Sequence, residues 1–196
     1  MKILLIADEE DKSIWDYYRP EKLAGVDLIL SAGDLKPEYL SFLVTMVNRP
    51  LLYIHGNHDH LYDVREPEGC ECIDDRIVTV NGLRIMGLGG SQLYSRGPYQ
   101  YSERQMRRRI RKLRFQLWRK KGVDIILTHS PAEGYGDMPD PTHRGFECFV
   151  ELIDKYKPKY FVHGHVHKSY NWKQNRILHR GETEIINACG KYIIEI

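Results

Sequence analysis

Short, almost entirely apolar runs alternate with polar segments along the first third of the chain. Residues 2–7, 26–30 and 51–54 form such runs, and charged or amide residues follow each of them closely. Runs of this length and composition predict buried strands. Between Pro37 and Asn48 the apolar positions repeat at helical spacing, with the proline in the first turn, where its missing N–H costs nothing. The succession of strand, helix and strand predicts a layered α/β fold.

After residue 70 the pattern indicates a hairpin and a long helix. Strands expected at 76–80 and 83–88 flank Asn81-Gly82, a dipeptide that favours a two-residue hairpin turn. Ser102 and Gln105 have the spacing of a capping box, so a helix is expected to start there. The further expected elements are a helical stripe at Met106, Ile110, Leu113 and Leu117, a helix at 146–153, strands at 124–127 and 159–162, and final strands at 177–178, 184–186 and 192–194 that complete a second sheet.

The composition is that of a folded protein. The chain has 196 residues, of which 42% are hydrophobic and 29% charged, as is ordinary for globular domains. No apolar run approaches the ~20 residues of a membrane span. Acids at positions 8–11 follow the first apolar run directly and leave no room for a signal peptide. We therefore expect residues 1–196 to form one cytoplasmic domain without a membrane segment, with its four cysteines as reduced thiols.

The charge is distributed unevenly. The net charge is +2, but residues 104–121 contain ten Lys or Arg residues and no acid. The remaining 19 basic and 27 acidic residues leave a net charge of −8 on the rest of the chain. We call residues 104–121, which lie in the expected long helix, the basic helix. Two interpretations of it stay open: a solvated face on a helix that packs on the sheet, or a surface that attracts RNA, DNA or an acidic partner.

Polar residues with metal-ligating side chains follow five of the predicted strands. They are Asp8, Asp34, Asn57 with His58, His129, and His165 with His167. In open α/β sheets, functional groups gather beyond the carboxyl ends of the strands. Mixed carboxylate, amide and imidazole ligands suit a pair of divalent cations that share a bridging carboxylate.

These motifs resemble those of the calcineurin-like metallophosphoesterase superfamily. The family pattern is Asp-x-His, Gly-Asp, Gly-Asn-His-Asp or Glu, a lone His, and Gly-His-x-His. The last four motifs are intact here, at Gly33-Asp34, Gly56 to Asp59, His129, and Gly164 to His167. The resemblance implies a four-layer α/β/β/α sandwich, in which two mixed β-sheets are flanked by helices around a binuclear metal site.

The resemblance also implies a role for each motif residue. Asp34 would bridge the two metals, and Asp8 and His167 would hold the first of them. His58 would act on the phosphoryl group and protonate the leaving oxygen, and would not bind metal. The second metal would be completed by Asn57, His129 and His165.

The chain departs from the family pattern at Glu10, where the family has histidine. Glu10 is either an oxygen ligand of the first metal or a side chain that hydrogen-bonds or faces solvent. A carboxylate ligand would make this site harder and more anionic, which favours Mn²⁺ or Mg²⁺ over Zn²⁺. We therefore expect two divalent metal ions, with Mn²⁺ ahead of Fe, Zn, Ni and Mg.

Three functions are consistent with these residues. The leading hypothesis is a metal-dependent phosphoesterase that hydrolyses a phosphodiester or phosphomonoester through attack by a metal-bridging hydroxide. A degenerate scaffold of the same fold that binds protein or nucleic acid is the first alternative, and a nuclease guided by the basic helix is the second. Leu35-Lys36-Pro37 stands where protein Ser/Thr phosphatases of this superfamily have Asp-Arg-Gly, which disfavours a phosphoprotein substrate.

Several aromatic and histidine residues remain outside these motifs. Three loop tyrosines, at 94, 99 and 101, either stack on a base or aryl group of a ligand or are ordinary loop residues. The other histidines are expected to support the site from behind its ligands or to lie on the surface; they are His55, His60, His143, His163 and His179.

Overall fold

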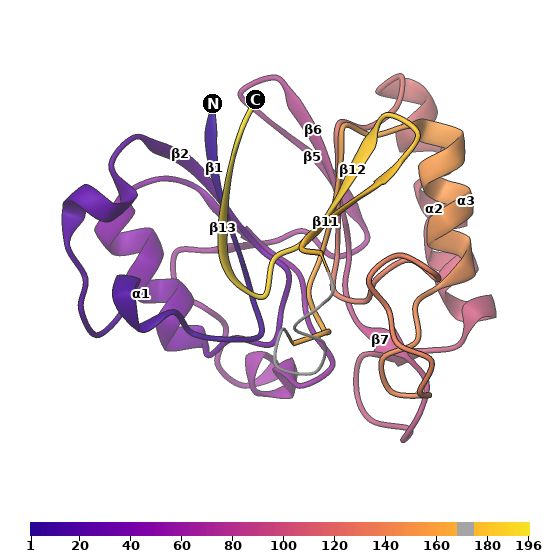
Figure 1. The fold of residues 1–196 in the computed structure, drawn as a ribbon, viewed down its shortest axis with the longest axis horizontal. Coiled ribbons are helices and arrows are strands. Elements are labelled where there is room, and N and C mark those ends of the chain that lie inside the picture. Colours follow the sequence, from indigo (N-terminus) through magenta and orange to yellow (C-terminus); the bar gives the residue numbers. More distant parts are fainter. Residues whose placement is uncertain (168–174) are drawn as a thin grey trace.

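Two β-sheets form the centre of the protein in the computed structural model, which describes residues 1–167 and 175–196 (Figure 1). The first sheet has five strands, in the spatial order β13 (Gly190–Glu195), β1 (Lys2–Ala7), β2 (Val26–Ser31), β3 (Leu51–Tyr53) and β4 (Glu71–Cys72). The second has six, in the order β11 (Ile177–Arg180), β12 (Thr183–Asn187), β10 (Tyr160–His163), β9 (Ile125–Thr128), β6 (Leu83–Leu88) and β5 (Arg76–Val80). A two-stranded sheet of β7 (Ser91–Gln92) and β8 (Gln100–Tyr101) lies apart from both.

Helices cover the outer face of each large sheet (Figure 1). Helix α1 (Pro37–Val47) packs on the first sheet, and α2 (Glu103–Arg119) and α3 (Glu147–Tyr156) pack on the second. Short 3-10 helices cover Lys12–Ile14, Pro20–Leu23 and Asp59–Asp63. The predicted four-layer α/β/β/α architecture is therefore confirmed.

Strand β1 shows why the apolar runs of the sequence are continuous. Ile3 and Leu5 belong to the core between the two sheets, whereas Leu4 and Ile6 belong to the core under α1. Successive side chains of a strand point to opposite faces, so a strand with a packed layer on both sides needs apolar residues at every position. The same argument applies to β2, which is also buried on both faces.

The local predictions for the hairpin and the long helix are confirmed. β5 and β6 pair antiparallel, with Asn81 at φ 50° and Gly82 at φ 86°, the left-handed values that a type I′ turn requires. Ser102 and Gln105 form both hydrogen bonds of the capping box at the start of α2. The short strands β4, β7 and β8 were not predicted, because two residues are too few to show a period.

The prediction that all the final strands join the second sheet is wrong for β13. β11 and β12 do belong to the second sheet, but β13 pairs antiparallel with β1 in the first. The amino group of Met1 donates to the carbonyl oxygen of Ile196 at 2.5 Å at the end of this pair. Strand-forming residues favour an extended backbone but do not determine which strand pairs with it. The pattern of residues 192–194 alone could therefore not show to which sheet this strand belongs.

Part of the basic segment is structural. Arg109 on α2 is 9% exposed. Its guanidinium donates to Asp75 Oδ1 at 2.8 Å and to the carbonyl oxygen of Gly89 at 2.6 Å, and it lies 4.2 Å from the ring centroid of Tyr101. This arginine therefore ties α2 to the loops that follow β4 and β6.

We expect Arg109→Ala to lower the free energy of unfolding by about 2–3 kcal/mol, because it removes one partner of a partly buried ion pair and leaves the Gly89 carbonyl without its donor. Urea denaturation followed by circular dichroism measures the change. Arg108→Ala is the matched control. Arg108 is the exposed neighbour of Arg109, so its replacement should lower the free energy of unfolding by no more than ~0.5 kcal/mol. Equal losses in the two variants would contradict a structural role for Arg109.

None of the helices in residues 1–167 and 175–196 is long and apolar enough to cross a lipid bilayer.

Candidate metal centre

The predicted site residues lie on loops that follow β1, β2, β3, β9 and β10. Three of them have left-handed backbones, with φ values of 61° at Asp8, 57° at Asp34 and 69° at His165. Such values are uncommon for residues other than glycine, although Asp, Asn and His adopt them more often than most. Left-handed backbone at three ligand positions directs these side chains toward one another, and strain of this kind is often found at functional sites.

Four of the predicted ligand atoms converge on one point. The Nε2 atom of His129 lies 3.0 Å from Asn57 Oδ1, 3.2 Å from His165 Nδ1 and 3.3 Å from Asp34 Oδ2. Two oxygens and two imidazole nitrogens thus face one another within a buried site. Imidazole, carboxylate and amide donors together suit a first-row divalent metal.

Backbone carbonyl groups hold both imidazoles in fixed orientations. His129 Nδ1 lies 2.7 Å from the carbonyl oxygen of Ala32, and His165 Nε2 lies 2.7 Å from that of Thr142. A carbonyl oxygen can only accept, so each of these ring nitrogens carries the proton. In the neutral form of each ring the opposite nitrogen then directs its lone pair at the shared point, an arrangement typical of metal-binding histidines.

The charges of these buried groups are strongly coupled. Burial lowers the pKa of His129, but the neighbouring Asp34 carboxylate outweighs it and raises that pKa to about 9. Burial likewise opposes ionisation of Asp34, yet the charge and hydrogen bond of His129 hold the pKa of that carboxyl well below its usual range. Burial, together with the charge of His129, lowers the pKa of His165 to about 3. The centre therefore combines an ionised carboxylate with one imidazole that stays neutral.

Asp8 has a buried carboxylate oxygen that lacks a partner. Its Oδ1 accepts a hydrogen bond from the backbone N–H of His165 at 2.8 Å, whereas Oδ2 has no hydrogen-bond donor within the described residues. A Cβ atom at Gly164 would lie 2.7 Å from this oxygen, so only glycine leaves the space around it open. Burial raises the pKa of Asp8 to about 6. An unpartnered buried carboxylate oxygen of this kind fits a cation.

The two glutamates after Asp8 point to different partners. Glu9 Oε1 lies 2.9 Å from His167 Nδ1, whereas Glu10 Oε2 lies 3.2 Å from Lys36 Nζ. Glu9, His167 and Cys189 each place a candidate ligand atom within 4.8 Å of the others. The sequence did not single out Glu9 or Cys189, because the position of Cys189 depends on the unforeseen pairing of the last strand with the first.

A cavity of about 390 Å³ opens beside the carboxylates. Asp8, Glu10, Asp34 and His58 all line it, so Glu10 shares a wall with two predicted ligands. His58 is exposed, and its backbone N–H donates to Asp34 Oδ1 at 2.8 Å. The remaining lining residues are Leu35, Lys36, Pro37, Asp59, Leu61 and Tyr62.

The loops after β2 and β3 interlock behind these ligands. A Cβ atom at Gly33 would lie 2.3 Å from the backbone nitrogen of Gly56, and one at Gly56 would lie 2.0 Å from Asp34 Oδ1. Asp59 Oδ2 accepts from the backbone N–H groups of Gly56 at 2.7 Å and Asp34 at 2.8 Å. Asp59 is the last residue of the Gly-Asn-His-Asp motif, and it thus fixes the relative position of the two loops.

Two of the loop tyrosines contact this region. The Tyr94 hydroxyl accepts a hydrogen bond from Asn57 Nδ2 at 3.0 Å, which directs the amide oxygen of Asn57 toward His129. Tyr99 stacks on His55, with ring centroids 4.4 Å apart. His55 in turn pairs with Asp74 at 2.7 Å, and Asp74 also accepts from the backbone of Gly89. His55 therefore stabilises the loop after β3, behind the predicted ligands.

The motifs and their geometry agree with the comparison with known families. Residues 1–169 match the family model described as calcineurin-like phosphoesterase. The chain belongs to this family. Family membership confirms the resemblance drawn from the sequence motifs and supports a metal-dependent phosphoesterase in general.

Proteins with related sequences occur in animals. A UPF0046 protein of Caenorhabditis elegans is 25% identical over 197 residues, which cover 84% of this chain and 63% of the relative. Human metallophosphoesterase domain-containing protein 1 is 27% identical over 125 residues, which cover 61% of this chain and 34% of that protein. The chain therefore spans less than two thirds of the length of these relatives.

Solved structures share the fold. TT1561 of Thermus thermophilus superimposes with a TM-score of 0.59 at 16% identity, over 96% of this chain and 89% of that one. GAP50, described as the anchor in the inner membrane complex of Plasmodium, superimposes with a TM-score of 0.56 at 14% identity, over 97% of this chain and 71% of that one. At these identities the likeness concerns the fold alone.

Proposed function

We propose that this phosphoesterase hydrolyses a phosphomonoester or phosphodiester with two divalent cations bound between the loops that follow β1, β2, β3, β9 and β10. The observation that carries the proposal is the convergence of Asp34 Oδ2, Asn57 Oδ1 and His165 Nδ1 on His129 Nε2. No structural role explains why a carboxylate, an amide and two oriented imidazoles should be directed at one point.

Each cation would have its own set of ligands. Asp34 would be shared, Asn57, His129 and His165 would complete one site, and Asp8, Glu10 and His167 the other. When bound, the cations supply an activated water nucleophile and neutralise charge on the phosphoryl group. The oxygen ligands at Asp8, Asp34 and Glu10 favour Mn²⁺ at the first metal site, which Asp8, Glu10 and His167 would complete.

The chain itself positions and protonates the substrate. His58 lines the cavity beside the carboxylates, and the hydrogen bond from its backbone N–H to Asp34 Oδ1 anchors the loop that carries it. A phosphoryl group in this cavity lies within reach of the imidazole, which donates a proton to the leaving oxygen as the bond to phosphorus breaks. Lys36, on the rim, adds a positive charge for the remaining phosphate oxygens.

The proposal is tested by metal analysis and hydrolysis together. Protein reconstituted with Mn²⁺ should bind two ions per chain, measured by mass spectrometry under native conditions, and should hydrolyse bis-p-nitrophenyl phosphate or p-nitrophenyl phosphate. Chelator should remove both the ions and the activity, and added Mn²⁺ should restore them. A chain that binds no divalent ion, or that binds two without hydrolysing either ester, would favour the scaffold alternative.

The metal centre offers a comparison between two adjacent glutamates. Glu10→Ala should reduce bound Mn²⁺ from two ions to one, because it removes a ligand from the cavity wall. Glu9→Ala should leave two ions at saturating Mn²⁺ but weaken the first site about 10- to 100-fold, because Glu9 only orients His167. Titration with Mn²⁺, followed by native mass spectrometry, measures both effects.

The same titration with Zn²⁺ gives the second half of this test. Loss of the Glu10 carboxylate should reduce the preference for Mn²⁺ over Zn²⁺, while Glu9→Ala should leave the preference unchanged. Two Mn²⁺ ions bound by Glu10→Ala with wild-type affinity would assign Glu10 to its ion pair with Lys36 and not to the metal.

The comparisons do not support the nuclease alternative. Family membership does not support nucleic-acid binding, and α2 uses Arg107 and Arg109 in ion pairs with acids of the chain itself.

A further inference from the structure

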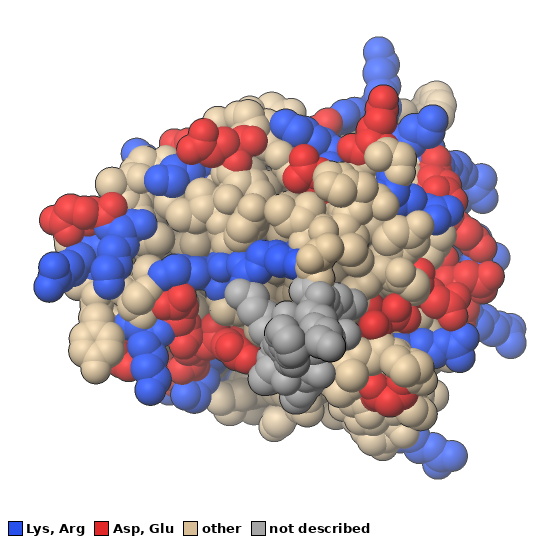
Figure 2. Space-filling model, in the orientation of Figure 1, with Lys and Arg blue, Asp and Glu red and all other residues tan. Residues whose placement is uncertain are grey.

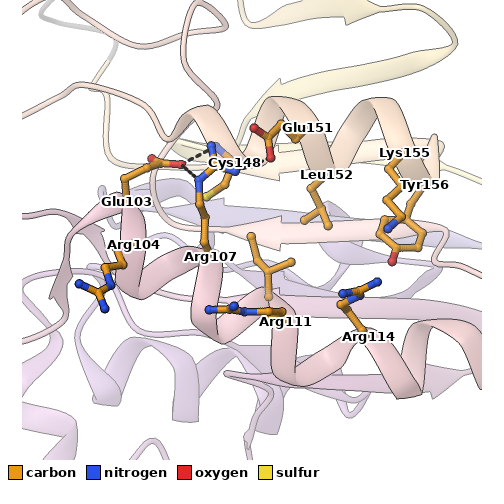
Figure 3. Close-up of a pocket in the computed structure, with 11 residues that line it drawn as sticks. Glu103, Arg104, Arg107, Arg111, Arg114, Cys148, Glu151, Leu152, Lys155 and Tyr156 are labelled. Carbon is orange, nitrogen blue, oxygen red and sulfur yellow. Dashed lines mark hydrogen bonds and ion pairs between the residues drawn. The ribbon is translucent and has the colours of Figure 1, made fainter.

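A groove of about 710 Å³ lies between α2 and α3, on the outer face of the second sheet (Figure 3). All of its lining residues come from these two helices, and none of them lines the cavity beside Asp8 and Asp34. The groove is therefore separate from the proposed catalytic centre. Its size is within the range of protein sites that bind ligands or peptide side chains.

The groove is bordered by cations without acidic partners. Arg104, Arg111 and Arg114 of α2 and Lys155 of α3 are exposed, and none forms an ion pair within residues 1–167 and 175–196. Like charges three or four residues apart destabilise a helix by a few tenths of a kcal/mol for each pair. Over the face seen in Figure 2, by contrast, acidic and basic side chains are interspersed.

Arg107, unlike the other arginines that line the groove, has acidic partners. It contacts Glu103 at 3.2 Å, Glu147 at 3.1 Å and also Glu151, so it links the two helices at one end of the groove. Figure 3 shows the contacts of Arg107 with Glu103 and Glu151 at one end of the groove, with Arg111 and Arg114 outside them. The acids nearest the groove are thereby neutralised, and the groove keeps a net positive charge.

The space between the helices is apolar. Ile110 of α2 and Leu152 of α3 both line it. Tyr156 of α3 lies near Arg114 (Figure 3). One turn beyond Arg114, Trp118 is 75% exposed, and Phe115 beside it is 66% exposed. Arginine, tyrosine and tryptophan next to a hydrophobic patch are the residues that contribute most energy to protein interfaces.

We propose that the groove between α2 and α3 docks an acidic, amphipathic helix of a partner protein. The partner's leucine or isoleucine side chains would fill the space between Ile110 and Leu152, and its carboxylates would pair with Arg111, Arg114 and Lys155. From Arg104 to Trp118 the surface extends ~21 Å along α2, since a helix rises 1.5 Å per residue. A partner helix of about four turns covers that length, and laying its apolar face in such a groove is a common mode of recognition.

A peptide fits these side chains better than a nucleic acid does. The centre of the groove is aliphatic at Ile110 and Leu152, and these side chains pack against leucine or isoleucine better than against a planar base. At one end of the groove Arg107 is already paired with Glu103, Glu147 and Glu151, so the cations that are free to bind a ligand are spaced and not continuous, which suits separate carboxylates better than a continuous phosphate backbone. Glutamates or aspartates that are several residues apart on the partner helix can each face one of Arg104, Arg111 and Arg114.

The probes are fluorescein-labelled 20-residue helical peptides with leucine or isoleucine on one face and glutamate along its borders, read by fluorescence anisotropy with the full chain. Saturable binding is expected, and a scrambled peptide of the same composition should not bind. The double variant Arg111→Glu, Arg114→Glu should weaken binding at least tenfold, because it replaces attraction by repulsion at two contacts. Trp118→Ala should weaken it about fivefold.

Lys112→Glu is the matched control, because Lys112 is exposed and lies on the far side of α2 from the groove. It should change the affinity less than twofold, and thermal unfolding should show that all variants are folded. No saturable binding by any of the amphipathic peptides at 100 μM protein would overturn the proposal. So would equal binding by the double variant. A 20-nucleotide single-stranded RNA that binds where the peptides do not, or a dimer of this chain that Arg111→Glu dissociates, would also overturn it.

Discussion

Asp34→Asn should reduce phosphoesterase turnover by about 10³-fold or more, because it removes the negative charge proposed to serve both cations, a contribution of several kcal/mol. Asparagine tolerates the left-handed backbone at this position and keeps an oxygen to accept the N–H of His58. The fold should therefore survive, and the loss should reflect charge. Mass spectrometry of metal content and steady-state hydrolysis of bis-p-nitrophenyl phosphate measure the two consequences.

The control for this substitution is Asp16→Asn, which changes the same charge at an exposed position outside the site. It should retain two ions and full turnover. If Asp34→Asn also retained both, Asp34 would be a structural hydrogen-bond acceptor and the bridging assignment would be wrong. A loss of metal without unfolding would support it.

His58→Ala should lower turnover by about 10²–10⁴-fold while both cations remain bound, because the imidazole is proposed to protonate the leaving group and not to ligate metal. The loss should be smaller for p-nitrophenyl esters than for alkyl phosphate esters, since p-nitrophenolate leaves without needing a proton. The measurement is therefore a comparison of the two ester classes in the wild type and the variant, with metal content determined in parallel.

His60→Ala is the matched control, on the 3-10 helix Asp59–Asp63 that directly follows His58. His60 is exposed and does not line the cavity, so its loss should leave turnover within twofold of the wild type. Equal losses for both ester classes in His58→Ala would leave the imidazole with an electrostatic role only. Loss of a metal ion in that variant would mean that His58 is a ligand.

The sequence predicted local structure well because local structure has local causes. The Asn81-Gly82 turn and the Ser102–Gln105 capping box depend on residues that are adjacent or three apart, and both are present. The partner of β13 depends on which sheet edge is free after all other strands have paired. That is a property of the whole fold, and no pattern within residues 190–195 encodes it.

The same distinction applies to the metal centre. Asp34, Asn57, His129 and His165 each follow a predicted strand, and the resemblance to the family implied that they share one site; their side chains do lie together. Which of two adjacent glutamates faces His167 depends on the backbone torsion angles after Asp8, which has a φ of 61°. Cys189 lies beside Glu9 because β13 pairs with β1. Since that pairing is a property of the whole fold, the sequence pattern could not predict the position of Cys189.

The pairing of β1 with β13 has a consequence for how the protein folds during synthesis. The hydrogen bond between Met1 and Ile196 joins residues 195 apart in the sequence. Contacts of such high sequence separation form slowly, because a long loop must close before they contribute. Until residues 190–195 leave the ribosome, one edge of β1 presents unpaired backbone groups that can pair with another chain. A nascent chain stalled before β13 should therefore aggregate through β1, and should need a chaperone on that edge more than anywhere else.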